Sequence, residues 1–177
     1  MHQLLLNRDI YTEFLIKYVP RARRFLWITT ADIKDLHVDT DGVYQPFLAL
    51  LAELVENGVA VRLIHAKEPG PRFREDFDLQ HALIDNELFE RILCPRVHTK
   101  AIVVDAQIAF VGSANLTGAG IGAKSDQKRN FEAGFAFDDQ KDIQQLMGWI
   151  DELYLGEYCH DCKRREFCPD PIIDRIE

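Results

Sequence analysis

The residues of this chain that are best suited to chemistry lie close together in the sequence, between His98 and Glu132. Lys100, Ser113 and Asn115 fall inside this stretch, so it combines an imidazole, an ammonium, a hydroxyl, an amide and a carboxylate. A phosphodiester resists hydrolysis because its anionic oxygens repel an incoming nucleophile. Catalysis therefore requires positive donors around those oxygens, an activated nucleophile and an acid for the leaving group. The side chains gathered here match these requirements.

One residue separates His98 from Lys100, so alternation along a strand is expected to place both on the same side of a sheet. We expect Asn115 to follow a strand end, where its amide reaches the same phosphate, and Ser113 to donate a further hydrogen bond. Nothing in this set requires a catalytic metal, in contrast to the Asp and Glu clusters that hold magnesium. The residue types thus favour phosphate chemistry carried out by an imidazole.

The full spacing is H-x-K-x4-D-x6-G-S-x-N, in which Asp105 supplies the aspartate and Gly112 the glycine. This complete pattern resembles the HKD motif of the phospholipase D superfamily. The resemblance implies that His98 attacks phosphorus and forms a phosphohistidine intermediate. It also implies that Glu132, in an Asn-Phe-Glu sequence, orients the imidazole. Asp105 belongs to the motif, but we expect it to have a structural role near a hairpin and no direct chemical one.

The resembled enzymes use two motif histidines, one that attacks and one that protonates the leaving oxygen and then activates water. This chain has one complete motif. His65 and Lys67 repeat the His-x-Lys spacing, but no aspartate or Gly-Ser-x-Asn sequence follows them, so we expect His65 to be an ordinary strand-end residue. The second catalytic histidine is expected to be His98 of another copy, in a symmetric homodimer that shares one active site.

Helical and strand-like hydrophobic periodicities alternate along most of the chain, which predicts an α/β fold with a layered, mixed β-sheet flanked by helices. The expected helices cover residues 8–19, 46–58, 73–89 and 139–155, and the expected strands cover 25–29, 59–64, 91–93, 98–104, 108–111 and 131–137. Ala106 and Gln107 indicate a tight hairpin between the two motif strands. This order of elements also resembles one repeat of the phospholipase D fold. We expect a catalytic domain at 1–155 and a cysteine-rich, metal-binding tail at 156–177.

Four cysteines form a second candidate site. Cys159, Cys162 and Cys168 have the spacing C-x2-C-x5-C, and Cys94 lies far upstream. Four thiolates suit either tetrahedral zinc or an iron–sulfur cluster. The spacing resembles the 4Fe-4S staple of helicase-linked and CRISPR-associated exonucleases, a resemblance that covers the tail alone because their catalytic fold differs. We expect a structural 4Fe-4S cluster ahead of zinc or a tail of free thiols; His160 is an alternative fourth ligand whose adjacency to Cys159 makes the geometry awkward.

The charge of the chain bears on its partners. The formal net charge of -8 disfavours a protein that coats nucleic acid through bulk electrostatics, but local fields decide whether a nuclease holds its substrate. Lys124, Lys128 and Arg129 lie beside the motif, and we expect them to contact substrate phosphates. A second basic cluster, Arg21–Arg24, fits an ordinary solvated surface equally well.

The N-terminal apolar run, Leu4–Leu6, is followed at once by Asn7, Arg8 and Asp9. It is too short for a signal peptide or a membrane span. We therefore expect a cytoplasmic protein with no membrane partner. Cysteines in that compartment bind metals more often than they form disulfides.

Together these features predict a metal-independent phosphodiesterase, specifically an endonuclease that hydrolyses DNA or RNA. Lipid enzymes of the resembled superfamily usually carry two motifs in one long chain or have membrane-spanning segments, whereas a compact chain with one motif resembles the dimeric nuclease branch. Two alternatives stay open. One is a lipid phosphodiesterase, which an exposed apolar patch beside the active site would favour, and the other is a non-catalytic nucleic-acid-binding or partner module. A helicase or another DNA- or RNA-processing protein is an expected partner of the nuclease.

Overall fold

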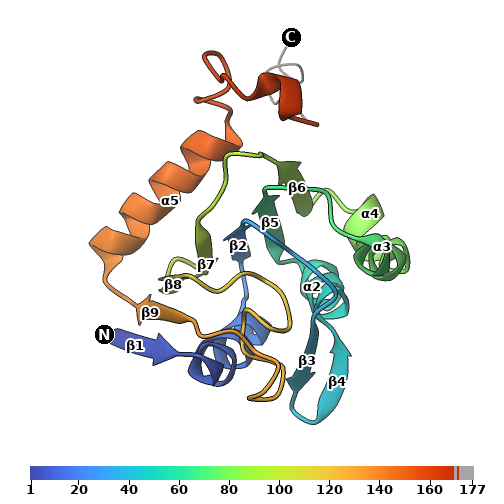
Figure 1. Cartoon of the computed structure of the whole chain (residues 1–177), viewed down its shortest axis with the longest axis vertical. Coiled ribbons are helices and arrows are strands. Elements are labelled where there is room, and N and C mark those ends of the chain that lie inside the picture. The colour runs from blue at the N-terminus through green and yellow to red at the C-terminus, as the bar shows by residue number, and fades with distance from the viewer. Residues whose placement is uncertain (170, 172–177) are drawn as a thin grey trace.

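A seven-stranded mixed sheet forms the centre of the computed structural model, which describes residues 1–169 and 171 (Figure 1). In spatial order its strands are β1 (His2–Leu6), β9 (Ala133–Phe137), β8 (Ile108–Gly112), β7 (Lys100–Val104), β2 (Phe25–Thr30), β5 (Ala60–His65) and β6 (Phe89–Leu93). Helices cover both faces of this sheet, so the predicted α/β class with a mixed, layered sheet is confirmed.

Strand direction determines which residues meet at one end of the sheet. Strands β2, β5 and β6 run parallel to one another, whereas β7, β8, β9 and β1 each run antiparallel to the preceding neighbour. The parallel strands therefore end where β7 begins, β8 ends and β9 begins. We call this end of the sheet the site edge, and define it by Thr30, His65, Leu93, Lys100, Gly112 and Ala133.

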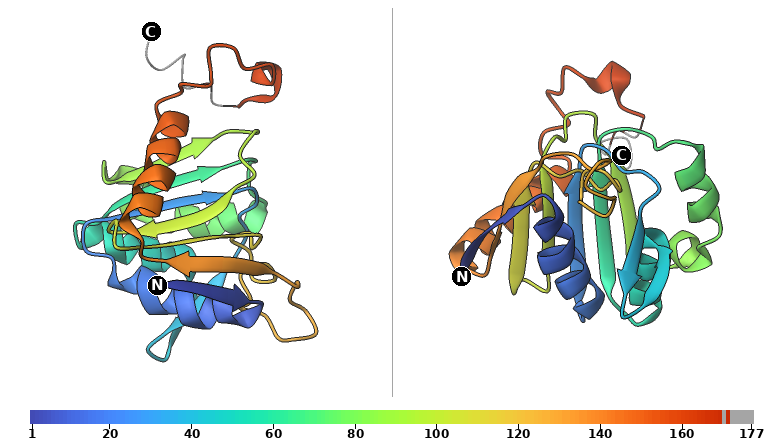
Figure 2. Two further views of the ribbon diagram at one scale, coloured as in Figure 1. Left: turned by 90° about the vertical axis from the view of Figure 1, so that its left-hand side faces the viewer. Right: turned by 60° about the horizontal axis from the view of Figure 1, so that its bottom comes forward.

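Two hydrophobic cores lie on the two faces of the sheet. The larger core contains the N-terminal helical segment and α2 (Phe47–Glu56), whose apolar side chains pack against β2 and β5. The N-terminal segment consists of a π-helical turn η1 (Ile10–Leu15), α1 (Ile16–Tyr18) and a 3-10 turn η2 (Val19–Arg21). The smaller core lies under α5 (Gln140–Tyr154), which runs across the other face (Figure 2). Asp139 begins this helix, because its carboxylate accepts hydrogen bonds from the backbone of Lys141 and Asp142.

The remaining elements surround α2 or belong to the tail. A two-stranded hairpin, β3 (His37–Thr40) with β4 (Val43–Pro46), leads into α2, and α3 (Pro71–Asp78) and α4 (His81–Asp85) follow β5. The tail after α5 contains one 3-10 turn, η3 (Arg165–Phe167). Residues 170 and 172–177 of the expected cysteine-rich tail lie outside the described residues. None of the helices in the described part of the chain combines the length and apolarity needed to cross a bilayer.

One expected helix is wrong, and a hairpin and a strand were not expected. The helix expected over 73–89 is two short helices, and its last residue is already part of β6. The segment around Asp39, where neither a helix nor a strand was expected, forms the β3–β4 hairpin, whose turn uses positive φ at Asp41 and Gly42. Strand β1 was not expected, because its partner β9 is more than 120 residues away and no local pattern reveals such a pairing.

His65, the last residue of β5, is fully buried. Arg91 Nε on β6 donates a hydrogen bond to His65 Nε2 at 2.8 Å, so the imidazole proton is on Nδ1, which donates to Lys67 O at 2.8 Å. Burial, reinforced by the positive charge of Arg91, lowers the pKa of His65 from 6.5 to about 4, although the carboxylates of Glu68 and Asp32 oppose this shift. His65 is therefore a neutral residue that ties β5 to β6.

This burial predicts a pH dependence of stability. The unfolded chain protonates His65 below its ordinary pKa of 6.5, whereas the folded protein does so only below about 4. Stability is thus fully present above that ordinary pKa and is lost as the pH falls toward the folded pKa, by roughly 3 kcal/mol in total. Urea unfolding from about pH 7 down to about pH 4.5 should show this slope in the wild type and its loss in His65→Gln. His81→Gln, at an exposed histidine of α4, is the control and should keep the wild-type slope; an unchanged slope in His65→Gln would contradict the assignment.

Candidate active site

His98 lies at the site edge in the connection between β6 and β7. It is exposed and precedes β7, so the expectation of a strand beginning at His98 is wrong by two residues. Lys100, the first residue of β7, donates a hydrogen bond from Nζ to the backbone oxygen of His98 at 2.6 Å. The ammonium thus fixes the backbone that carries the imidazole. Among the described residues, the imidazole of this exposed histidine makes no hydrogen bond, so its ring nitrogens are available to a ligand.

Lys100 is almost completely buried, with 7% of its surface exposed. Burial lowers the pKa of its ammonium, and the nearby carboxylate of Glu132 acts in the opposite direction. A cation held out of water interacts more strongly with a phosphate than a solvated one does, because the local dielectric constant is low. Lys100 is therefore suited to stabilising negative charge beside His98.

Glu132 and Ser113 are joined where β8 ends and β9 begins. The hydroxyl of Ser113 donates to the Glu132 carboxylate, whose other oxygen accepts a hydrogen bond from Asn130 Nδ2 at 3.1 Å. The hydroxyl also accepts from the backbone of Ala133 at 3.1 Å. Among the described residues, the carboxylate does not reach the imidazole of His98, so its predicted role in orienting that ring stays a prediction.

Asn7 is a positioning residue that sequence reasoning missed. Its backbone N–H donates to Glu132 O at 2.8 Å, and its side-chain oxygen accepts from Glu132 N at 3.0 Å. Asn7 adopts a positive φ of 51° directly after β1, and Gly122 approaches it closely: a Cβ on Gly122 would lie 2.7 Å from Asn7 O. A turn-type asparagine after an apolar run was the available sequence signal.

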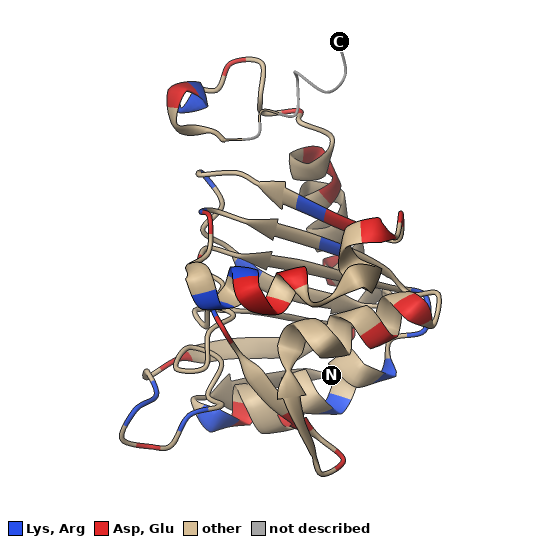
Figure 3. Ribbon diagram, turned by 90° about the vertical axis from the view of Figure 1, so that its right-hand side faces the viewer, with Lys and Arg blue, Asp and Glu red and all other residues tan. Residues whose placement is uncertain are grey.

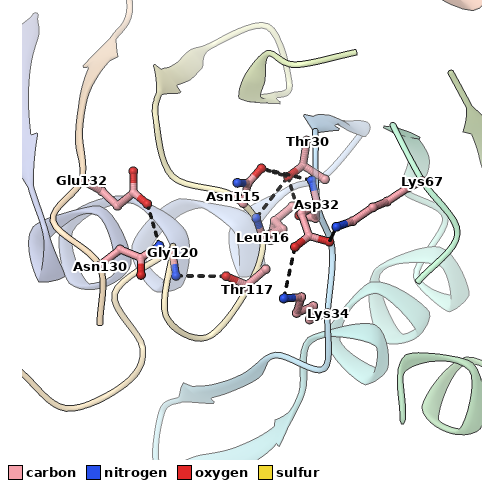
Figure 4. Close-up of polar contacts among 10 residues, drawn as sticks. All are labelled: Thr30, Asp32, Lys34, Lys67, Asn115, Leu116, Thr117, Gly120, Asn130 and Glu132. Atoms are coloured by element: carbon pink, nitrogen blue, oxygen red, sulfur yellow. Dashed lines mark hydrogen bonds and ion pairs between the residues drawn. The ribbon is translucent and has the colours of Figure 1, made fainter. Parts of the chain in front are cut away.

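Asn115 is held from the β2 side of the site edge. Its side-chain oxygen accepts a hydrogen bond from Asp32 N at 3.0 Å, and the following residue, Leu116, donates from its backbone to Thr30 Oγ1 at 3.1 Å (Figure 4). Because the amide oxygen is used in this way, the amide nitrogen of Asn115 is the group that can donate to a ligand. This geometry fits the phosphate-binding role expected for Asn115.

Two further cations lie beside Asn115. The Asp32 carboxylate, which follows β2, forms ion pairs with Lys34 Nζ at 3.3 Å and with Lys67 Nζ at 3.2 Å (Figure 4). Both lysine side chains are more than 60% exposed, whereas that of Asp32 is 18% exposed. The fold thus brings Lys67, from the incomplete His-x-Lys sequence, to the same edge as the complete motif. Sequence spacing alone gave no reason to group these residues.

Asp105 lies at the opposite end of β7 from Lys100, about 17 Å away for a strand of this length. Its carboxylate accepts hydrogen bonds from the backbone of Arg23 at 2.8 Å, Arg24 at 2.8 Å and Phe25 at 3.0 Å. Its φ is 55°, as is that of Ala106, and these values form the tight turn into β8. The carboxylate of Asp105 therefore fixes the start of β2 through these hydrogen bonds. Asp105 and the basic cluster around Arg23 lie together, away from the site edge.

Comparison with known families identifies this arrangement. A family model described as "Cardiolipin synthase, PLD-like domain" matches residues 15–154. The chain belongs to the phospholipase D-like family. None of the curated proteins compared with the chain by sequence matches it.

Solved structures share this phospholipase D-like fold at low sequence identity. NucT from Helicobacter pylori superposes with a TM-score of 0.66 at 16% identity, covering 87% of this chain and 95% of NucT. Nuc from Salmonella typhimurium, a phospholipase D family member, gives 0.61 at 14% identity, with 87% and 94% covered. TrmBL2, an archaeal chromatin protein, gives 0.59 at 9% identity over 86% of this chain and 51% of its own length. The predicted resemblance to the superfamily and its fold is confirmed.

The loop after the motif carries the expected substrate-binding residues. It extends from the site edge between Thr117 and Glu132 (Figure 2), and Lys and Arg positions occur along it, coloured blue in Figure 3. Lys124 and Lys128 are exposed, whereas Arg129 is half-buried and forms an ion pair with Asp126 at 2.6 Å. The two lysines, rather than Arg129, are thus available to a ligand at this edge.

One of the four cysteines, Cys94, lies inside the matched domain, and the other three follow it. The family match ends at residue 154, before the tail that carries Cys159, Cys162 and Cys168. The structure brings these three residues together with Cys94, and all four line one cavity of about 240 Å³. Within the described residues, no three His, Cys, Asp or Glu side chains are close enough to hold a single metal ion.

Proposed function

We propose that this chain is a metal-independent phosphodiesterase that acts as an endonuclease on DNA or RNA in the cytoplasm. The observation that carries this proposal is the pairing of an exposed imidazole with a buried ammonium at the site edge. His98 is exposed, and Lys100 is held out of water two residues away and bonded to the His98 backbone. Lys100 and the amide of Asn115 supply the positive donors that phosphate chemistry requires.

The proposed reaction has two steps. A ring nitrogen of His98 attacks phosphorus, a P–N bond forms, and the P–O bond to the leaving oxygen breaks. That oxygen takes a proton from a second, protonated histidine, which thereby becomes a base. It then removes a proton from water, and the resulting hydroxide breaks the P–N bond and releases His98 with a phosphate monoester.

We further propose that a second copy of the chain supplies the second histidine. Beside Glu132, the β1–β9 edge carries exposed apolar side chains: Leu4, Leu6, Phe131 and Phe135 are 53%, 47%, 95% and 51% exposed. Leu4 and Phe135 are direct neighbours across the two strands. Helix α5 runs across the middle of this face (Figure 2, left), where it packs on Phe137 of β9 but leaves Leu4 and Phe135 exposed. An apolar patch adjoining a site with one histidine is suited to a symmetric contact that completes the site.

A nucleic acid is the substrate that the charge distribution favours. Lys34 and Lys67 lie on one side of Asn115, and Lys124 and Lys128 lie on the loop beyond it. Cations spread along an edge suit a polyanion with successive phosphates better than a single headgroup. Of the proteins that share the fold, two are named NucT and Nuc, and TrmBL2 is described as binding DNA. A helicase or similar processing protein is the partner that would deliver such a substrate.

A lipid phosphodiesterase is the second candidate. The exposed apolar side chains beside Glu132 and the family description as a cardiolipin synthase domain support it. In that case the patch would meet acyl chains rather than another copy of the protein.

Cleavage assays with a substrate panel test the proposal. The full chain should be incubated in excess EDTA with labelled single- and double-stranded DNA and RNA, and separately with phospholipid vesicles. We expect cleavage of at least one nucleic acid and none by His98→Ala. Release of a headgroup from the vesicles, with the nucleic acids intact, would establish the lipid enzyme instead. Binding of nucleic acid by both proteins without cleavage would establish a non-catalytic module.

A further inference from the structure

Segments from distant parts of the sequence bring the four thiols to one cavity. Cys94 follows β6, and its backbone donates to His65 O at 2.9 Å. The other three come from tight turns in the tail, where Cys162 N donates to Cys159 O at 3.2 Å and Cys168 N donates to Arg165 O at 3.0 Å. Cys168 Sγ lies 4.0 Å from the backbone oxygen of Leu93, directly beside Cys94. All four cysteines of the chain are half-buried around this one space.

The size of the cavity distinguishes two kinds of occupant. A single zinc ion with sulfur ligands at about 2.3 Å would require four thiolates in mutual contact. The described residues form no such close group, and all four cysteines instead line one cavity of about 240 Å³. A 4Fe-4S cluster takes one thiolate per iron and holds its four ligands farther apart. We propose that Cys94, Cys159, Cys162 and Cys168 ligate a 4Fe-4S cluster in this cavity.

The walls of the cavity suit such a cluster. Trp149 and Leu153 of α5, with Tyr158, provide apolar surface that limits access of water. Arg96 and Arg165 also line the cavity, and Arg96 Nη1 donates to Tyr158 O at 3.5 Å. Four thiolates bring more negative charge than the cluster core neutralises, and the guanidinium groups offset the remainder. Ligation releases the thiol protons and involves no electron transfer by the protein.

The position of the cluster indicates a structural role. It would join the tail to the β6–β7 connection at Cys94, and His98 lies four residues farther along that connection. Because Trp149 and Leu153 also line the cavity, the same group would hold the end of α5 against the sheet. This inference does not rest on the proposed nuclease activity, since its test measures bound iron and not cleavage.

Metal analysis of the full chain tests the proposal. Protein purified without oxygen, and protein reconstituted anaerobically with equal amounts of ferrous and ferric iron and with sulfide, should be brown and contain about four iron and four sulfide per chain. Replacing any one of the four cysteines by serine, Cys94→Ser included, should lower iron below about half of the wild-type content. His160→Ala is the control, because His160 is exposed and does not line the cavity, and it should keep full iron content. Circular dichroism of each variant separates loss of iron from loss of fold.

Other results would overturn the proposal. Colourless protein with one zinc per chain would assign a different metal. Protein without metal would show that the four cysteines ligate none. In that case a thiol reagent would titrate all four cysteines in the folded state, or two disulfides would be found. Full iron content in a folded Cys94→Ser variant would show that the cluster belongs to the tail alone. A mass spectrum of the native protein gives the cluster mass independently of colour.

Discussion

Replacement of His98 by alanine is expected to lower the rate of phosphodiester cleavage by at least about 10⁴-fold, because it removes the nucleophile of the proposed reaction. The free energy of unfolding should change little, since the imidazole is exposed and makes no hydrogen bond within the described residues. The measurement is kcat/KM on a labelled oligonucleotide in EDTA, with urea unfolding of the same samples. His81→Ala removes an exposed histidine of α4 and should keep wild-type activity. Residual activity within tenfold of the wild type would exclude His98 as the nucleophile.

Heterodimers of wild type and His98→Ala test whether two copies share one site. If each reaction needs two His98 side chains, the heterodimer lacks either its nucleophile or its acid and should lose at least about a hundredfold in activity. Two affinity tags on co-expressed chains isolate the mixed species. Phe135→Asp places a charge on the exposed β1–β9 patch and should yield an inactive monomer with an intact His98. A heterodimer with half of the wild-type activity, or an active Phe135→Asp monomer, would rule out the shared site.

Lys100→Met is expected to reduce kcat by about 10³-fold while leaving the protein at least as stable as the wild type. The ammonium of Lys100 is buried, and burial lowers its pKa, so the desolvated charge raises the free energy of the folded state. An apolar side chain of similar length removes that cost and should leave the free energy of unfolding unchanged or higher by up to about 2 kcal/mol. Steady-state kinetics and urea unfolding on the same preparation measure both effects.

Lys67→Met provides the matched comparison for Lys100. Lys67 is exposed and pairs with Asp32 at the same edge, so it is positioned to hold a flanking phosphate and not the reacting one. Its loss should raise KM several-fold and leave kcat near the wild-type value. If Lys100→Met also changed only KM, or if it unfolded the protein, the buried ammonium would not have the electrostatic role assigned to it.

The motif and the strands around it were predictable because their information is local. The alternation of apolar residues identifies β7 and β8, and the His98-to-Asn115 spacing identifies the family that the sequence match confirms. The turn between them was expected at Ala106 and Gln107, and the structure forms it with positive φ at Asp105 and Ala106. The helix α5 was also predicted closely, since its apolar face repeats at helical spacing.

The missed features depend on contacts between distant segments. Asn7 reaches Glu132 only because β1 pairs with β9, and Lys34 and Lys67 meet only because β2 and β5 are parallel neighbours. The start of β7 was misplaced because the alternation of side chains does not show where backbone pairing begins. In the described sheet, His98 is not paired, and β7 begins at Lys100. Periodicity identifies elements, whereas the partners of each site residue follow from strand order.

The pairing of β1 with β9 also sets the time at which the site can form during synthesis. β1 is made first, but Glu132 and the strand that receives β1 are made more than 120 residues later. At ordinary translation rates this delay is on the order of ten seconds. Until Phe137 has left the ribosome, Asn7 has no Glu132 to hold, so a nascent chain carries His98 without its completed surroundings. The proposed activity would thereby be confined to chains whose synthesis has passed β9.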